Sequence, residues 1–184
     1  GLAILDNSDP TGPVTYSFIE PGAYFSMIRY AAVSEDGNYC YVSDGTQHVW
    51  VVDITDKLNP VVRSTAHPFV AAGSVTCLAV AGSSLVVGTA TTIETVDVST
   101  PSYPAMIYQE AITGGIRSMI PFTHPSYPDR NFLGAVSSDS FHAFRSDNGF
   151  LVESGFLNGF SNLSDLAVAG TFAYLIDNND GNIY

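Results

Sequence analysis

Two arginines at equivalent positions of a repeated pattern are the side chains that most readily suggest ligand chemistry. Arg29 and Arg117 stand in the first apolar run of two different repeats, where Thr76 and Ser164 occupy the corresponding positions. The chain has only six Lys and Arg residues, so this coincidence is informative. Planar guanidinium groups bind carboxylates and other anions through paired hydrogen bonds. With Asp165 the arginines form a candidate ligand site, and the alternative is that they pair with nearby acidic groups or carbonyls.

Patterns typical of metal binding or catalysis are sparse. The four histidines lack a His-x-x-x-His spacing and the cysteines lack a Cys-x-x-Cys spacing, which argues against zinc. Residues 177–182 read Asp-Asn-Asn-Asp-Gly-Asn, but Gly181 stands where a calcium-binding EF-hand loop needs an acidic ligand. A hairpin turn explains this segment without a metal. We therefore expect no metal, no cofactor and no catalytic residue, with calcium at residues 177–182 as the alternative.

A unit of about 44 residues recurs along the chain. Each copy has an apolar residue followed by Asp, and then a Pro seven residues after that Asp. The copies are Leu5-Asp6 with Pro13, Val52-Asp53 with Pro60, and Val96-Asp97 with Pro104. The run Leu78–Gly82 returns 88 residues later as Leu166–Gly170, so the phase persists over two further periods. Periods in this range indicate solenoids, propellers or arrays.

Each unit reads as four short strands separated by turn residues. The second full copy has apolar, β-branched runs at 75–81, 85–89, 93–98 and 105–110, with a turn at Gly82-Ser83-Ser84, and the first has them at 26–33, 39–43, 49–54 and 60–65. Four antiparallel strands in a unit of about 40–45 residues indicate a β-propeller blade. Because blades stack face against face, a run such as Val49–Val52 need not alternate apolar with polar residues.

We predict an all-β chain of three whole four-stranded blades with a half-blade at each end. The half-blades cover residues 1–19 and 162–184, the whole blades cover 24–66 and 74–110, and a divergent blade covers 116–156. The two half-blades are complementary, so they could complete one shared blade in a closed four-bladed ring. Asn182–Tyr184, however, reads as the start of a third strand that Gly1–Ile4 would duplicate. This favours part of a larger propeller of about six to eight blades.

The recurring Asp and Pro predict a structured turn between the third and fourth strands. We expect Asp6, Asp53 and Asp97 to accept hydrogen bonds from backbone N–H groups two residues ahead. Proline fits at the first position of an outer strand, where its missing N–H breaks no hydrogen bond of the sheet. A metal-binding or catalytic role for these aspartates is the alternative.

The segment Trp50–Val62 resembles the repeat named for its Leu-Val-Ile-Val-Asp consensus, the LVIVD repeat, and Thr95–Pro104 and Ala3–Pro10 match it less fully. The resemblance implies a β-propeller of bacterial or archaeal surface or secreted proteins and implies no catalytic activity. It weakens in the third copy, where Arg145 stands near the expected Asp and residues 124–131 are expected to lengthen a loop. Binding and catalytic residues often lie on such longer loops, so the divergent blade is a candidate location for a functional site. The alternative is ordinary sequence divergence between repeats without a functional role.

Composition narrows the partners and the compartment. The chain has 18 Asp and Glu residues and a net charge of −12, which disfavours nucleic acid and anionic membranes as partners. It contains no apolar run long enough to span a bilayer. Few charged residues and many aromatic ones favour an extracellular or cell-surface location. Asn162 begins a glycosylation sequon. Cys40 and Cys77 form either a disulfide or two small buried hydrophobic side chains.

The sequence therefore favours a non-catalytic extracellular or cell-surface propeller that binds protein or carbohydrate, with a homo-oligomer, a filament or a larger extracellular assembly as further options. The alternative is a hydrolase or lyase with its site in the central funnel. Such a site needs convergent His, Asp or Glu residues on the inner strands. These strands supply Arg29, Arg117 and Asp165 but no His, which favours binding over catalysis.

Overall fold

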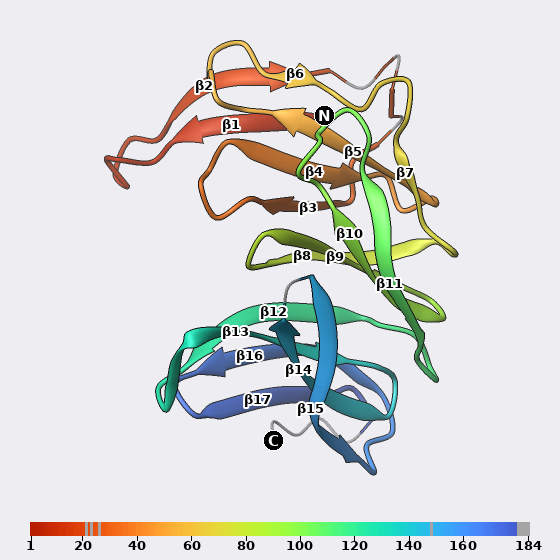
Figure 1. The fold of residues 1–184 in the computed structure, drawn as a ribbon. Helices are drawn as coiled ribbons and strands as arrows, with labels where there is room; N and C mark the ends of the chain where they lie inside the picture. Colours follow the sequence, from red (N-terminus) through yellow and green to blue (C-terminus); the bar gives the residue numbers. More distant parts are fainter. Residues whose placement is uncertain (21, 23, 26, 148, 180–184) are drawn as a thin grey trace.

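The computed structural model describes residues 1–179 except 21, 23, 26 and 148. These residues form 17 β-strands in five sheets, and they contain no helix (Figure 1). Among them, accordingly, no helix has the length and apolar character needed to cross a membrane. The prediction of an all-β chain is confirmed.

The sheets follow one another in chain order. The N-terminal half-blade contains β1 (Leu2–Asp6) and β2 (Val14–Ile19). The first whole blade contains β3 (Tyr30–Val33), β4 (Tyr39–Ser43), β5 (His48–Asp53), β6 (Val61–Val62) and β7 (Phe69–Val70). The second contains β8 (Val75–Ala81), β9 (Ser84–Thr89), β10 (Thr92–Asp97) and β11 (Ala105–Ala111). The third contains β12 (Ser118–His124), β13 (Tyr127–Val136), β14 (Ser140–Asp147) and β15 (Phe150–Asn158), and the C-terminal half-blade contains β16 (Leu163–Ala169) and β17 (Phe172–Asp177).

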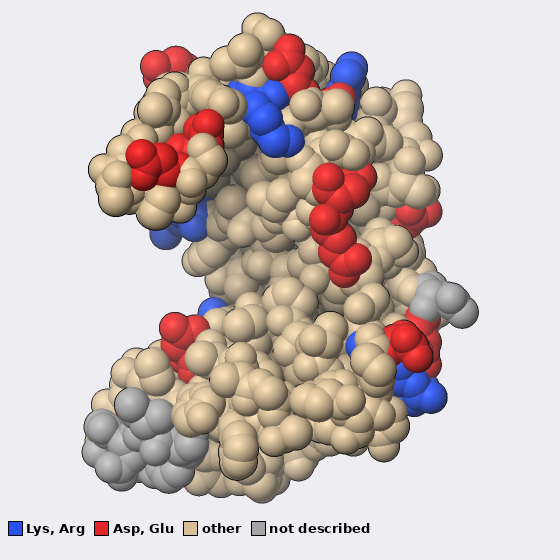
Figure 2. All heavy atoms as spheres, turned by 90° about the vertical axis from the view of Figure 1, so that its left-hand side faces the viewer, with Lys and Arg blue, Asp and Glu red and all other residues tan. Residues whose placement is uncertain are grey.

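The sheets are antiparallel meanders that stack along an arc. The hairpins β1–β2 and β16–β17 lie at opposite ends of this arc, so the described residues do not close a four-bladed ring (Figure 1). The third strand expected at Asn182–Tyr184 lies outside the described residues. The arc leaves the molecule open on one side (Figure 2).

Each blade is held by apolar cores on both of its faces. In β5, Val49 and Val51 pack into a cluster shared with the second blade, while Trp50 and Val52 pack into a cluster shared with the N-terminal half-blade. All four side chains are at most 6% exposed. Successive residues of a strand point to opposite faces, so a fully apolar strand fills two different cores. Two further clusters join the second blade to the third and the third to the C-terminal half-blade.

The two half-blades have one covered face each. On the outward face of β1 and β2, Leu5, Tyr16 and Phe18 are 56%, 45% and 50% exposed. On the outward face of β17, Phe172 and Tyr174 are 67% and 46% exposed. The end hairpins therefore carry apolar side chains on their outward faces as well as on their covered faces.

The same aspartate hydrogen bond recurs in three turns. Asp6 accepts from the Ser8 N–H at 2.9 Å, Asp53 from Thr55 at 2.9 Å, and Asp97 from Ser99 at 2.8 Å. Prolines 13, 60 and 104 each immediately precede the outer strand that follows. The second oxygen of Asp53 also pairs with Arg63 at 2.8 Å. The Thr55 N–H, followed by Arg63, lowers the pKa of Asp53 to about 2.

The outer strand of the first blade is split, and the prediction of one strand at 60–65 is wrong. Val61–Val62 (β6) pairs with the end of β5, at Val52 and Asp53. The chain then leaves the sheet and pairs with the start of β5 as β7. At the break, the Val51 N–H donates to the Ser64 hydroxyl at 2.8 Å. A side-chain oxygen therefore replaces the missing backbone acceptor, which keeps this buried donor satisfied.

The insertion at residues 124–131 lengthens a hairpin, so the prediction of a longer loop is also wrong. Strands β12 and β13 continue as a pair to His124 and Tyr127. Phe122 faces Phe132 across the two strands, with ring centroids 5.5 Å apart. Aromatic pairs across strands stabilise antiparallel sheets, which explains why this segment extends the hairpin.

The two cysteines are free and lie in different cores. Cys40 packs between the N-terminal half-blade and the first blade, whereas Cys77 packs between the second and third blades. They do not form a disulfide. Burial raises the pKa of Cys40 to about 11 and that of Cys77 to about 12, so both remain thiols at neutral pH.

Removing the charge of Asp53 is expected to change the pH dependence of stability. The folded-state pKa of about 2 lies below the ordinary value of 3.8, so the stabilisation is present above pH 3.8 and is lost as pH falls toward 2. Asp53→Asn should lower the free energy of unfolding by about 1–2 kcal/mol at pH 7 and by much less near pH 2. Urea unfolding across this range measures the difference, and a difference independent of pH would contradict the prediction.

The cores between blades are expected to dominate stability. Leu85, 1% exposed, and Leu5, 56% exposed, form a matched pair on strands of different blades. Leu85→Ala should cost about 2–5 kcal/mol of unfolding free energy because it leaves a cavity. Leu5→Ala should cost about 0.5 kcal/mol or less. Equal losses in chemical denaturation would contradict this assignment of the core.

Candidate functional site

The predicted ligand residues Arg117 and Asp165 join two neighbouring sheets. The Arg117 side chain donates from Nη1 to the Asn162 amide oxygen at 2.6 Å and to the Leu163 carbonyl at 2.8 Å. Asp165 accepts from the Ser118 hydroxyl at 2.7 Å. These bonds link the start of β12 to the start of β16. A charged network of this kind fixes the spacing of adjacent blades, which is the structural alternative that the sequence left open.

Arg29 stands apart from this network. Its guanidinium makes no hydrogen bond or ion pair with the part of the chain that the structure describes, and its stem passes over Gly45. The equivalent residue Thr76 donates its hydroxyl to the Ile116 carbonyl of the next blade. The structure thus brings Arg117 and Asp165 together through Ser118 and Asn162, but it shows no contact between them and Arg29.

The other predicted sites occupy ordinary structural positions. Asn162 is half-buried, with its amide oxygen bound to Arg117, and its glycosylation remains a prediction. Asp177 accepts from the backbone N–H groups of Ser161 and Asn179, and residues 180–182 of the suggested calcium loop lie outside the described residues. Within residues 1–179, with the four gaps noted above, no group of three or more His, Cys, Asp or Glu side chains could hold a metal ion.

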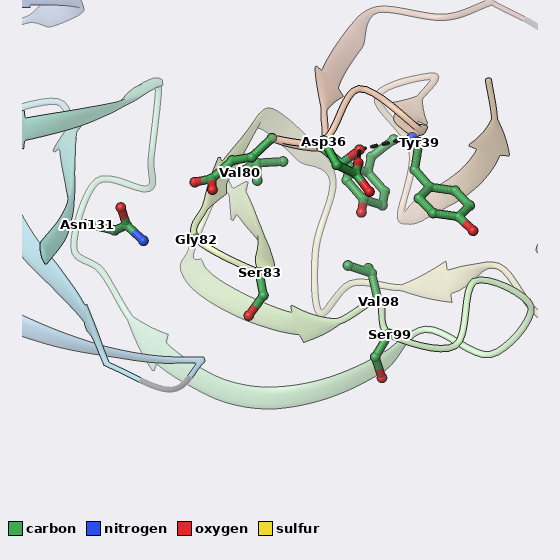
Figure 3. Close-up of a pocket in the computed structure, with 11 residues that line it drawn as sticks. Asp36, Tyr39, Val80, Gly82, Ser83, Val98, Ser99 and Asn131 are labelled. Carbon is green, nitrogen blue, oxygen red and sulfur yellow. Dashed lines mark hydrogen bonds between the residues drawn. The ribbon is translucent and has the colours of Figure 1, made fainter. Parts of the chain in front are cut away.

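A groove of about 530 Å³ lies between turns of the first two blades and strand β13 of the third. We call it the turn groove. Val80, Val98 and Tyr41 line it with apolar side chains that also belong to the core between the first two blades. Asn131 lies on one side of Gly82 and Ser83, and Tyr39 lies on the other (Figure 3). The polar residues that line it are Ser34, Glu35, Asp36, Ser83, Ser99 and Asn131.

The turn groove continues onto the extended hairpin of the third blade. A second hollow of about 290 Å³ shares Glu35, Gly82 and Asn131 with it and reaches Phe122 and Phe132. Three blades therefore contribute to one continuous surface. Turn residues held on a stacked scaffold are a common location for binding sites.

The turn groove is negatively charged. No Lys or Arg lines it, whereas Glu35 and Asp36 do. Asp36 is held by the Ser34 hydroxyl at 2.5 Å and by the Asn38 backbone and side-chain N–H groups at 3.0 and 2.8 Å. These donors, Ser34 first, lower the pKa of Asp36, so it stays ionised at neutral pH. Acidic side chains also gather in one run on the face of the molecule seen in Figure 2.

Gly82 sets the shape of the groove where the second and third blades meet. Its φ of +62° is unfavourable for residues with a side chain. A Cβ placed there would lie 2.8 Å from the Asn131 amide nitrogen. Glycine therefore permits both the tight turn between β8 and β9 and the close approach of the β12–β13 hairpin.

Sequence reasoning did not single out the residues of the turn groove as a site. The sequence pattern identifies Gly82 only as a turn residue and Asn131 only as part of an insertion. A usable signal was present, because the 44-residue period puts corresponding turns on the same side of the molecule. The closeness of Asn131 to Gly82 depends on the hairpin extension, which the period does not encode.

Comparison with known families and structures agrees with the repeat and the fold. The LVIVD repeat matches residues 31–65 and 72–109, which confirms the resemblance seen in Trp50–Val62 and Thr95–Pro104. The weaker resemblance at Ala3–Pro10 lies outside these ranges. No curated protein matches the chain in sequence.

Several solved propeller structures match the chain in three dimensions. They include Saccharomyces cerevisiae Sqt1 (TM-score 0.70, 10% identity, 99% of this chain and 56% of that one) and the WD40 repeats of RRP9 (0.63, 15%, 85% and 46%). A “putative 6-phosphogluconolactonase” from Bacteroides uniformis also matches (0.65, 16%, 94% and 54%). At these identities the likeness concerns the fold alone. The chain spans about half the length of the structures that it matches.

Two glycines in equivalent turns allow a matched test of the groove geometry. Gly170 has φ +61°, and a Cβ added to it would meet no atom within 4 Å, whereas one added to Gly82 would meet Asn131. Gly170→Ala should cost about 1 kcal/mol of stability through backbone strain alone. Gly82→Ala should cost more, because Asn131 must also move. Thermal unfolding of both variants measures the difference, and equal shifts would show that the contact is unimportant.

Proposed function

We propose that this chain, which carries LVIVD repeats on a β-propeller fold, is a non-catalytic module that binds a segment of a partner protein in the turn groove. We place it in an extracellular or cell-surface setting because its composition is acidic, aromatic and poor in charged side chains. The observation that carries the proposal is a single groove formed by turns of the first two blades and by strands β12 and β13 of the third.

The chemistry of the groove suits a peptide segment. Its base offers apolar contacts from Val80 and Val98, and its rim offers hydroxyl, amide and carboxylate groups. Binding sites commonly combine such an apolar surface with a few polar groups that fix orientation. Asp36 is already held in place by three hydrogen bonds, so little conformational entropy is lost when a partner binds.

The structural likeness to WD40 repeats supports protein recognition. The likeness to a “putative 6-phosphogluconolactonase” raises the alternative of a hydrolase in the central funnel. The contacts of Arg117 and Asp165 weigh against that alternative, because both side chains bond to a neighbouring sheet or strand. We therefore expect the purified chain to leave 6-phosphogluconolactone hydrolysis at its spontaneous rate.

Peptide selection tests the binding function directly. A random peptide library displayed on phage is selected on the purified chain, and the enriched peptides are synthesised for titration. Ser83→Trp fills the groove from an exposed turn position, and Thr171→Trp makes the same change in the equivalent turn of the C-terminal half-blade. We expect Ser83→Trp to weaken binding at least about tenfold and Thr171→Trp to leave it unchanged.

Three results would contradict the proposed function. Enriched peptides that bind both tryptophan variants equally well would place recognition elsewhere on the molecule. Failure to enrich any peptide, or lactone hydrolysis above the spontaneous rate, would remove the basis for a peptide-binding module.

A further inference from the structure

A separate hollow of about 370 Å³ lies on the extended hairpin of the third blade. It opens on the face of the sheet that points away from the second blade, since Phe144 packs toward that blade and its neighbours Ala143 and Arg145 line the hollow. It shares only Phe122 and Phe132 with the turn groove and its continuation. It therefore offers a second, chemically different site.

Aromatic rings form one wall of this hollow. Phe122 and Phe132 stack with centroids 5.5 Å apart and an interplanar angle of 24°. Tyr127 and His124 approach Phe132 with centroids 6.2 Å away in each case. Tyr127 is 52% exposed, so part of this wall is available to a ligand. Rings arranged in this way offer a flat apolar surface against which another ring can pack.

Two arginine side chains, Arg130 and Arg145, bring positive charge to the same hollow. The Arg130 guanidinium carbon lies 5.6 Å from the centre of the Tyr127 ring, and no ion pair joins Arg130 to an acidic group among the residues that the structure describes. Arg145 donates from Nε to Asp147 at 2.7 Å, a partly exposed pair that solvent weakens. Both arginines keep N–H groups available for a ligand.

The charge of this hollow is opposite to that of the rest of the molecule. No Asp or Glu lines it, although the chain carries a net charge of −12. Asp129, which precedes Arg130 in β13, does not line the hollow. Positive charge is thus gathered at one place in an acidic protein.

We propose that this hollow binds a small organic carboxylate that carries a ring. The carboxylate accepts hydrogen bonds from Arg130 and Arg145, and the ring packs against Tyr127 and Phe132. Guanidinium groups suit this task because their planar N–H groups match the two oxygens of a carboxylate. The aromatic wall adds apolar contact that a bare inorganic anion cannot use. This site is independent of the peptide-binding groove.

Titration calorimetry of the purified chain with benzoate and glucuronate tests the proposal and distinguishes an aromatic acid from a sugar acid. The neutral partners benzamide and glucose retain the rings without the charge. We expect at least one of the two acids to bind at least about tenfold more tightly than its neutral partner and than inorganic phosphate.

Two arginine variants make the site assignment specific. Arg130→Gln should weaken binding of the acid about tenfold or more. Arg29→Gln changes the net charge equally at an exposed position outside the hollow, and it should leave binding unchanged. Tyr127→Ala, a change at an exposed position, should weaken binding of the acid without altering the circular dichroism spectrum.

Clear results would overturn this inference. Absence of binding by both acids would do so, as would equal binding of each acid and its neutral partner. Equal losses in Arg130→Gln and Arg29→Gln would show that attraction is a general charge effect. None of these results bears on peptide binding to Ser83 and its surroundings, so the two proposals fail separately.

Discussion

The structure depends on the burial of both faces of each blade. A four-stranded sheet whose strands are apolar on both sides cannot hide its side chains alone, and the cores on either side of the first and second blades show the solution. Val51 and Val52 are adjacent in β5, yet they belong to different cores. Stacking therefore follows directly from an apolar run that does not alternate, and it also brings the turns of adjacent blades close enough to share a groove.

Polar groups act mainly where the regular sheet ends or meets its neighbour. Asp6, Asp53 and Asp97 satisfy backbone donors in equivalent turns, and Ser64 accepts from the strand that its own segment leaves. Arg117 connects the third blade to the next sheet. These contacts keep the turns in fixed positions, which a binding surface assembled from several turns requires.

The period and the local strand pattern predicted most of the fold. Strand β8 begins and ends where the sequence indicated, at residues 75 and 81, because Gly and Ser residues mark the turn that follows it. The split outer strand was not predictable from its apolar residues, since the break depends on the side-chain acceptor Ser64. The hairpin extension was missed because the Pro, Ser and Asp residues of segment 124–131 resemble a loop, whereas the pairing of Phe122 with Phe132 is decided across strands.

The candidate sites were less predictable than the fold. Their equivalent repeat positions predicted Arg29 and Arg117 as ligand-binding residues. The Arg117 guanidinium, however, already donates a hydrogen bond to the Leu163 carbonyl. Gly82 and Asn131 are far apart in sequence and become neighbours only after the blades stack and the hairpin lengthens. Arg130 and Tyr127 likewise become informative once their strand direction is known.

The half-blades at the two ends of the arc are covered on one face only, so fewer packing contacts hold them than hold the blades between them. In stacked repeats, stability is close to a sum of terms for each unit and for each contact between neighbours. Within the described residues, β1–β2 and β16–β17 each pack against one neighbouring sheet, so in this stretch of chain they should exchange their amide hydrogens fastest. The residues that line the groove belong to the three blades that are flanked on both sides, where we expect slower exchange.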